Sequence, residues 1–246
     1  MRIAKILIIP LTILLLNGRC TSEKKKHQKS TTTTQNKIPS SIINEIEKKT
    51  REGAQKNKPV EKLSFVLNDK NAIPFFFNYQ KENPEKKVRI TTRFGSIDIK
   101  LFNDTPYHRA NFIYLTKKGY FNGTTFHRVV PGFIIQGGNS DRYETSRKRS
   151  EIGKYLLPPD TRNGHKHHRG VVSMPSSEIE NPYKLASPFE FFIVQQVTGA
   201  YHLDGSYTVF GEVIAGMKVV DEINKQRVDN RETPLTNVFM EISILE

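Results

Sequence analysis

The most informative stretch of this 246-residue chain lies just past its midpoint. It reads Phe126-His127-Arg128-Val129-Val130-Pro131-Gly132-Phe133-Ile134-Ile135-Gln136-Gly137-Gly138-Asn139. Two short apolar runs flank a Pro-Gly pair, a pattern that predicts two strands joined by a turn. The two consecutive glycines that follow allow a tight turn, because glycine tolerates backbone angles that other residues avoid.

Short strands are predicted on both sides of this stretch. Val88, Ile90 and Thr92 alternate with charged or polar neighbours, and Ile97, Ile99 and Leu101 repeat the period of two, so residues 88–101 form a hairpin with one buried face. Further strands are expected at Thr125–Val130, Phe133–Gln136, Gly170–Met174, Phe191–Gln195, Val209–Val213 and Phe239–Leu245. Many short strands favour a closed β-barrel, which leaves no exposed edge.

Two helices complete the predicted domain. Thr105 is placed to cap the first helix, Pro106 stands at its first position, and Gly119 follows its end. The second helix fits Met217 to Lys225. The segment Asp141–Asp160 is basic in its first half and is predicted to be a solvated loop.

The stretch at 126–139 resembles the signature of the cyclophilins. Three more family motifs follow in the family's order: Phe191-Phe192-Ile193, His202-Leu203-Asp204-Gly205 and Val209-Phe210-Gly211. The resemblance covers residues 88 to 246. It implies a mainly β fold, a closed eight-stranded antiparallel barrel capped by two helices, and peptidyl-prolyl cis/trans isomerase activity on proline-containing polypeptides without a cofactor.

The resemblance also implies a set of site residues. Arg128 matches the family's catalytic arginine, and Gln136 matches the glutamine that positions it. The positions that match the proline pocket are Phe133, Ile134, Phe192 and Leu203. Four substrate-binding positions depart from the usual family residue: Glu190, His202, Tyr207 and Pro175. A carboxylate at Glu190 is expected near Arg128, where an ion pair would occupy the guanidinium, and Pro175 lacks the N–H of the residue it replaces.

Three function classes stay open at the level of sequence. The first is an isomerase, which needs neither nucleophile nor metal, and the chain displays no convincing set of either. The second is a binding module or holdase for proline-containing segments, with weak turnover because of Glu190 and Pro175. The third is an anchored scaffold that recruits a partner through Leu63–Tyr79.

Composition and residue spacing argue against a nucleic-acid-binding protein and against a metal-binding protein. The net charge is +13, yet no run interleaves aromatic and basic residues as a nucleic-acid groove would, so no nucleic acid partner is expected. His165, His167 and His168 lie close together, but no cysteine or second carboxylate stands at ligand spacing, so no metal site is expected.

The N-terminal region predicts export and anchoring. Arg2 and Lys5 precede an apolar run, Ile6 to Leu16, that is shorter than the roughly 20 residues needed to cross a bilayer. The only cysteine, Cys20, ends this run, and the segment 1–20 resembles a bacterial lipoprotein signal with Cys20 as the lipidation site. Arg19 departs from that pattern, which has a small residue there. The chain is therefore expected in the cell envelope rather than the cytoplasm, held by a lipid at the outer membrane or on the periplasmic face of a membrane.

The remaining N-terminal residues divide in two. Residues 21–62 are polar and have a biased amino-acid composition. They are predicted to be a disordered tether, because they can bury too little apolar surface to offset the entropy lost on ordering. Residues 63–86 are rich in aromatic side chains and are predicted to pack on the following domain, 87–246.

Overall fold

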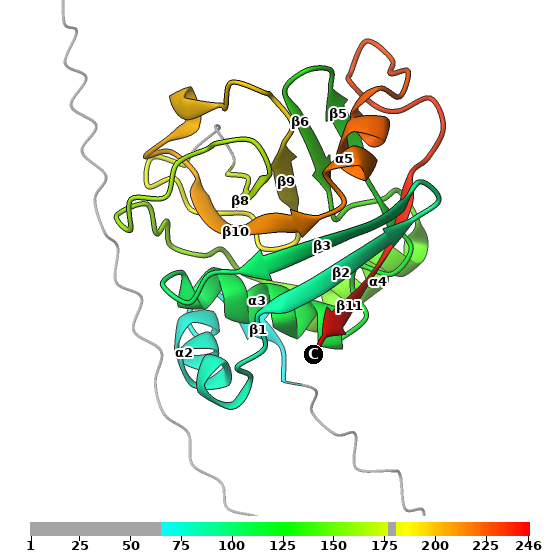
Figure 1. Cartoon of the computed structure of the whole chain (residues 1–246). Coiled ribbons are helices and arrows are strands. Elements are labelled where there is room, and N and C mark those ends of the chain that lie inside the picture. The colour runs from blue at the N-terminus through cyan, green and yellow to red at the C-terminus, as the bar shows by residue number, and fades with distance from the viewer. Residues whose placement is uncertain (1–64, 177–180) are drawn as a thin grey trace, which may run out of the picture. The chain divides into compact units, whose positions relative to one another are not determined.

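One antiparallel sheet of nine strands organises the fold of this computed structural model, which describes residues 65–176 and 181–246 (Figure 1). The predicted signal segment, Cys20 and the tether 21–62 lie outside the described residues. Across the sheet the strands follow the order β4 (Thr124–Thr125), β11 (Phe239–Leu245), β2 (Lys87–Thr92), β3 (Gly95–Leu101), β10 (Thr208–Ala215), β8 (Val171–Met174), β9 (Phe191–Val194), β6 (Ile134–Gly137) and β5 (Arg128–Val130). The strands were predicted at nearly these positions, and the mainly β fold class is confirmed.

The predicted closed eight-stranded barrel is wrong, because the sheet is a curled half-barrel. The single strand expected at Thr125–Val130 is broken into β4 and β5, which stand at opposite ends of the strand order. β4 pairs with β11, whereas β5 pairs with β6. On the other side of β5, the Val129 N–H donates to the carbonyl oxygen of Glu232 at 2.8 Å. A loop rather than a strand therefore covers this edge.

The β2–β3 hairpin shows why the sheet has one buried face. Val88 pairs with Ile99 and Ile90 with Ile97, and all four side chains are fully buried. The intervening residues are exposed or half-buried. This alternation follows from the two-residue repeat of a strand, so the sequence pattern predicted it directly.

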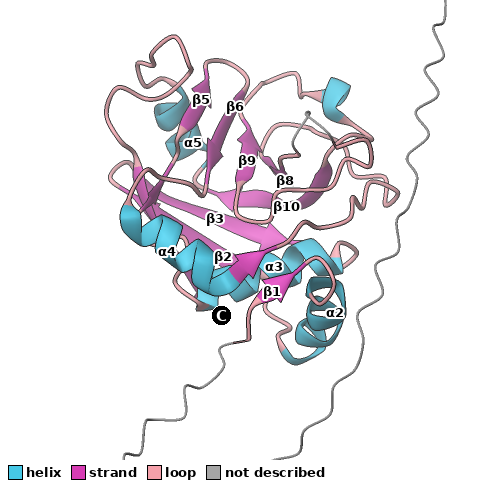
Figure 2. Cartoon of the chain, turned by 180° about the vertical axis from the view of Figure 1, so that it is seen from behind, coloured by secondary structure: helices cyan, strands magenta, loops and turns pink. Residues whose placement is uncertain are grey.

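The two predicted helices are present as α3 (Pro106–Lys117) and α5 (Met217–Asn224). Thr105 precedes Pro106 as expected, but its hydroxyl donates to the Phe102 carbonyl at 3.4 Å rather than capping a helix N–H. Every residue of α3 from His108 to Thr116 is buried, and Figure 2 shows α3 lying between the sheet and α2. α3 is thus the central helix of the core.

Two further helices were not predicted as such. α4 (Tyr143–Ile152) occupies the segment expected to be a solvated loop, so that expectation is wrong. Thr145 and Ile152 are its buried residues, and its sequence lacks the apolar repeat that signals an amphipathic helix. The other helix, α2 (Ala72–Glu82), begins one turn before Phe75-Phe76-Phe77, and Pro74 is tolerated because it falls in the first turn.

A small second sheet joins these additions. β1 (Leu67–Asn68) pairs in parallel with β7 (Gly153–Lys154), which follows α4 directly. Gly153 has a φ of 125°, and a β-carbon there would lie 1.9 Å from the carbonyl oxygen of Leu67. Only glycine allows the two strands to come this close.

α2 packs on α3 through aromatic rings and one arginine. Phe76 is fully buried, with its ring 5.9 Å from that of Tyr114 and 5.7 Å from that of Tyr155. Arg109 of α3 is also buried, and its guanidinium donates to the carbonyl oxygens of Gln80, Asn83 and Glu85 at 3.0–3.5 Å. Backbone acceptors in the last turn of α2 and just after it are thereby satisfied by a neighbouring helix.

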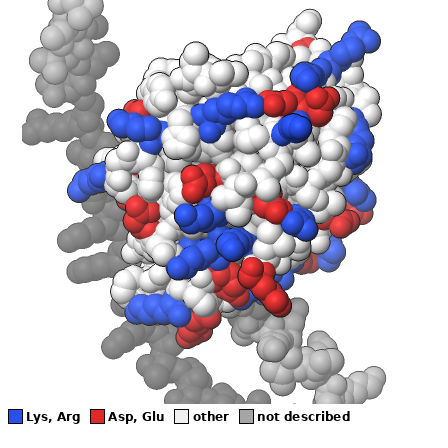
Figure 3. Space-filling model, in the orientation of Figure 1, with Lys and Arg blue, Asp and Glu red and all other residues white. Residues whose placement is uncertain are grey.

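Charges of both signs are mixed over the face seen in Figure 3, where Lys and Arg side chains lie among Asp and Glu side chains without forming a single-sign field. Ion pairs among the described residues include Arg89 with Asp98 at 2.7 Å and Lys100 with Glu212 at 3.6 Å. Among the helices of the described residues, none is long and apolar enough to cross a membrane.

The contrast between Phe76 and Phe77 tests whether α2 belongs to the core. Phe76 is 0% exposed and Phe77 is 50% exposed. Phe76→Ala should lower the free energy of unfolding by about 3–5 kcal/mol, as for other buried phenylalanines. Phe77→Ala, the matched control, should cost under about 1 kcal/mol. Urea unfolding followed by circular dichroism measures both, and equal effects of the two variants would refute core packing by α2.

His108 of α3 is a buried histidine whose two ring nitrogens have no hydrogen-bond partner among the described residues. Its ring stacks near Phe210 at a centroid distance of 6.2 Å. Burial lowers the pKa of His108 from 6.5 to about 3. The folded state therefore holds this imidazole neutral at a pH where the unfolded chain would protonate it.

This difference in pKa between the folded and unfolded states predicts that the free energy of unfolding falls in acid. The stabilising effect of a neutral His108 is fully present above pH 6.5 and is lost as the pH falls towards about 3, because the unfolded chain binds the proton first. At pH 5 the loss amounts to about 2 kcal/mol. His108→Leu should therefore flatten the fall in unfolding free energy between pH 7 and pH 5, whereas His168→Gln, at an exposed histidine, should not. Urea unfolding at both pH values measures the free energy of unfolding. An equal fall between pH 7 and pH 5 in wild type and His108→Leu would exclude this role.

Candidate functional site

A cavity of about 510 Å³ opens at the end of the sheet formed by β5, β6 and β9. The 3₁₀ turn η1 (Tyr201–Leu203) and the residues that follow β8 also reach it. It is lined by Arg128, Phe133, Ile134, Gln136, Pro175, Ser176, Phe192, His202, Leu203 and Tyr207. The cavity thus collects nine of the ten site residues predicted within the described chain, and Glu190 is the exception.

The apolar part of the lining is a small core of its own. Ile134 and Phe192 are buried together with Val194 and Val209, while Phe133 and Leu203 pack against this cluster and stay partly open. The His202 ring stacks on Phe133 at a centroid distance of 5.4 Å, and Tyr207 meets Phe192 edge-on at 5.9 Å. These contacts hold the aromatic rings in place, so the cavity offers a preformed apolar surface.

The polar part of the lining is the pair Arg128 and Gln136. The two residues stand directly opposite each other in the β5–β6 ladder, and the Arg128 Nη1 donates to the Gln136 side-chain oxygen at 3.4 Å. The Arg128 Nε donates to the carboxylate of Glu232 at 2.7 Å. Glu232 was not singled out from the sequence, because it lies 104 residues away in a loop without a recognisable motif.

The ion pair expected between Glu190 and Arg128 is not formed. The Glu190 carboxylate accepts hydrogen bonds from the side-chain amides of Gln136 at 2.9 Å and Asn139 at 3.2 Å. The ring nitrogen Nε2 of His127 lies 3.5 Å from it. Burial raises the pKa of Glu190, but the hydrogen bonds and charge of His127, with Gln136 and Arg149, outweigh burial and hold it below its ordinary value. Glu190 is therefore a charged acceptor that orients Gln136.

The glycine pair seen in the sequence brings Glu190 to this position. Gly138 has a φ of 101°, and a β-carbon there would lie 2.4 Å from the carbonyl oxygen of Phe189. The segment that carries Glu190 therefore packs directly on the backbone that follows β6. A side chain at Gly138 would force the two apart.

Pro175 lies at the rim of the cavity, directly after β8. Its carbonyl oxygen accepts a hydrogen bond from the Ser187 N–H at 2.7 Å, which ties the rim to the segment before β9. Proline has no N–H to offer a substrate backbone here. This edge therefore has one backbone donor fewer than it would with any other residue at this position.

Behind the cavity lies a buried set of residues that looks like a hydrolase triad. His167 Nδ1 is 2.8 Å from the Asp204 carboxylate, and its Nε2 is 3.1 Å from the Ser173 hydroxyl, which donates to the Thr208 carbonyl. Burial lowers the pKa of His167, and Asp204 partly offsets this. Ser173 and His167 are fully buried and do not line the cavity, so the set supports Phe192, on which His167 stacks.

The histidines near the cavity form no metal centre among the described residues. His165 is paired with Asp104, with its Nε2 2.9 Å from one carboxylate oxygen. Across residues 65–176 and 181–246 no group of three or more histidine, cysteine or carboxylate side chains is arranged to hold a metal ion.

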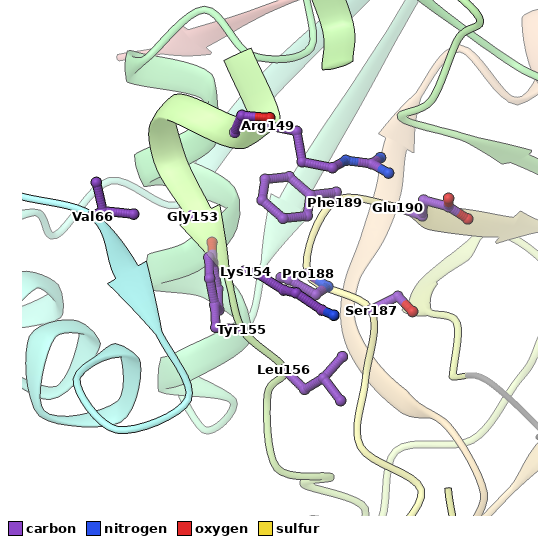
Figure 4. A pocket seen from close by; sticks show the side chains of 11 residues that line it. Val66, Arg149, Gly153, Lys154, Tyr155, Leu156, Ser187, Pro188, Phe189 and Glu190 are labelled. Atoms are coloured by element: carbon purple, nitrogen blue, oxygen red, sulfur yellow. The ribbon is translucent and has the colours of Figure 1, made fainter. Parts of the chain in front are cut away.

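A second cavity, also of about 510 Å³, adjoins this region on the side of β1 and α4 (Figure 4). Its walls are mostly apolar, and Arg149 and Lys154 supply the positive charge. It is lined by Val66, Arg149, Ser150, Gly153, Lys154, Tyr155, Leu156, Ser187, Pro188, Phe189 and Glu190. Glu190 links the two cavities, because it lines the second and bonds Gln136 of the first.

Comparison with known proteins places the chain in a family. The model of the cyclophilin type peptidyl-prolyl cis-trans isomerase family matches residues 87–243. The chain belongs to this family. Peptidyl-prolyl cis-trans isomerase-like 3 of Dictyostelium discoideum is 35% identical over 156 residues, which cover 62% of this chain and 91% of that protein. A peptidyl-prolyl cis-trans isomerase of the bacterium Acinetobacter baylyi is 36% identical over 138 residues, or 55% of this chain and 70% of its own length.

Longer relatives contain a matching domain as a fraction of their length. The chain spans 28% of the peptidyl-prolyl cis-trans isomerase-like 2 of Rhizopus delemar, with 38% identity over 160 residues. Among solved structures, a cyclophilin type isomerase of Cryptosporidium parvum superposes with a TM-score of 0.55 and 27% identity, covering 66% of this chain and 98% of that one. Each of these matches covers between 55% and 66% of this chain.

Proposed function

We propose that this chain catalyses cis/trans isomerisation of X-Pro peptide bonds in polypeptides. The observation that carries the proposal is the cavity, in which the apolar side chains of Phe133, Ile134, Phe192 and Leu203 lie beside the polar pair Arg128 and Gln136. The size and lining suit a proline ring with its flanking peptide groups. A Cryptosporidium parvum cyclophilin, 27% identical to this chain, has been solved in the presence of the dipeptide Ala-Pro.

The reaction needs only rotation about a partial double bond. Its barrier is roughly 18–20 kcal/mol, and the uncatalysed change takes tens to hundreds of seconds. An acceleration of about 10⁵ requires about 7 kcal/mol of extra stabilisation of the transition state. No nucleophile, metal or cofactor is required for this, since no covalent bond is broken.

Arg128 supplies the main electrostatic contribution in this proposal. As the bond twists, the prolyl nitrogen becomes pyramidal and gains a lone pair, so a nearby N–H donor with positive charge stabilises the transition state more than the ground state. Gln136 and the charged Glu190 behind it hold the polar side in place. The aromatic rings of Phe133 and Phe192 hold the proline ring in place while the part of the peptide before the X-Pro bond rotates.

Replacement of Arg128 tests the mechanism. Arg128→Ala should lower kcat/KM about 10²–10³-fold, by analogy with the loss of an oxyanion-hole donor. Arg128→Lys should restore it only in part, because a point charge lacks the planar fork. Peptide isomerisation followed by NMR exchange gives the rates, circular dichroism checks folding, and Arg147→Ala at an exposed arginine of α4 is the control. Wild-type protein that binds proline peptides without turnover would instead favour the holdase function.

The cellular context is part of the same proposal. The N-terminal sequence supports a bacterial lipoprotein, anchored to a membrane of the cell envelope through Cys20 and acting on exported or envelope proteins. The support is the short apolar run that ends at the only cysteine, within residues that the structure does not describe. A stable anchor needs more than one acyl chain.

Mass spectrometry of the native protein tests this anchor. We expect a mature chain that begins at an acylated Cys20 and partitions into the detergent phase on Triton X-114 extraction. Cys20→Ala should leave the protein unacylated and in the aqueous phase. A mature N-terminus elsewhere, with an unmodified Cys20, contradicts the proposal.

A further inference from the structure

Glu232 is the unexpected neighbour of the site. Its carboxylate accepts a hydrogen bond from Arg128 Nε at 2.7 Å, although it does not itself line the cavity. An arginine side chain has five N–H groups. Within the described residues, Glu232 accepts the Nε–H of Arg128 and Gln136 accepts one N–H of Nη1, so three of its five N–H groups have no hydrogen-bond partner there.

The backbone holds Glu232 in register with Arg128. The Glu232 carbonyl oxygen accepts from the N–H of Val129, the residue next to Arg128, at 2.8 Å, and its own N–H donates to Asp229 at 3.0 Å. The Asp229 carboxylate in turn accepts the N–H groups of Arg231 at 2.8 Å and Thr233 at 2.9 Å. The turn at 229–233 is therefore closed by hydrogen bonds on both sides of Glu232.

Glu232 also adopts an unusual backbone conformation. Its φ is 63°, in the left-handed region that glycine occupies easily and a glutamate does not. A glycine would suit the turn better, so the turn alone does not explain a glutamate here. What glutamate adds is a carboxylate that reaches Arg128.

We propose that Glu232 is a positioning residue for the isomerase reaction, which holds the Nε edge of Arg128 so that the opposite edge of the guanidinium faces the substrate. This inference rests on the function proposed above. An exposed ion pair is often worth little for stability, and here both side chains are about 40% exposed. Its value lies in orientation, since a small misplacement of a catalytic group lowers the rate strongly.

Two substitutions of Glu232 distinguish its orienting effect on Arg128 from the effect of its charge and from its effect on the stability of the turn. Glu232→Gln keeps an oxygen that accepts from Nε but removes the charge, so kcat/KM should stay within about twofold of wild type. Glu232→Gly favours the left-handed backbone and removes the side chain, so kcat should fall about tenfold with KM nearly unchanged and the melting temperature unchanged or higher. Asn230→Gly adds similar flexibility to the same turn and should keep wild-type kinetics.

A spectroscopic readout accompanies the kinetics. The Nε–H signal of Arg128, identified by its loss in Arg128→Lys, should exchange slowly with water in wild type and in Glu232→Gln, and rapidly in Glu232→Gly. Equal or higher turnover in Glu232→Gly, or an unchanged Nε–H signal, overturns the positioning role. Wild-type protein without turnover overturns the proposed function instead, whatever the Nε–H signal does.

Discussion

The site depends on the antiparallel register of three short strands. In that register Arg128 of β5 stands opposite Gln136 of β6, and Gln136 stands opposite Phe192 of β9. Because side chains alternate along a strand, these three residues and Ile134 share one face, and the cavity lies on that face. Their neighbours Val129, Ile135 and Ile193 point to the other face, into the main core.

This alternation divides the apolar residues into two clusters with different tasks. The larger cluster packs the sheet against α3, α2 and α5, and its largest buried side chains are aromatic. The smaller cluster, with Phe192 and Ile134, forms the apolar wall of the cavity. A slip of one residue between β5 and β6 would move Arg128 away from Gln136. It would also turn the side chains that line the cavity to the opposite face of the sheet, into the main core. The dense packing of the main core therefore secures the geometry of the site.

Two carboxylates flank the polar side of the cavity, and the sequence could identify only one of them. Glu190 was visible because it precedes Phe191-Phe192 within a family motif, yet its partner is Gln136 rather than Arg128. Gly138 allows the Glu190 segment to pack close to β6, which turns the carboxylate towards Gln136 and Asn139. Glu232 carries no local signal, since its pairing depends on a turn that follows α5 and returns to the edge of β5.

By itself, the sequence predicted most strands of the main sheet and the helices α3 and α5, and its resemblance to the cyclophilins predicted most of the cavity lining. Period-two patterns in 88–101 and the motif at 126–139 are local features, and local features follow from backbone geometry and burial. The tertiary structure alone decided that the sheet is a curled half-barrel, that 143–152 forms a helix, and that Arg128 pairs with Glu232. In each case the physical reason is a long-range contact: Val129 bonds Glu232 at the sheet edge, and β7 after α4 pairs with β1. Such contacts join residues 86 and 103 positions apart, and no local pattern of side chains encodes them.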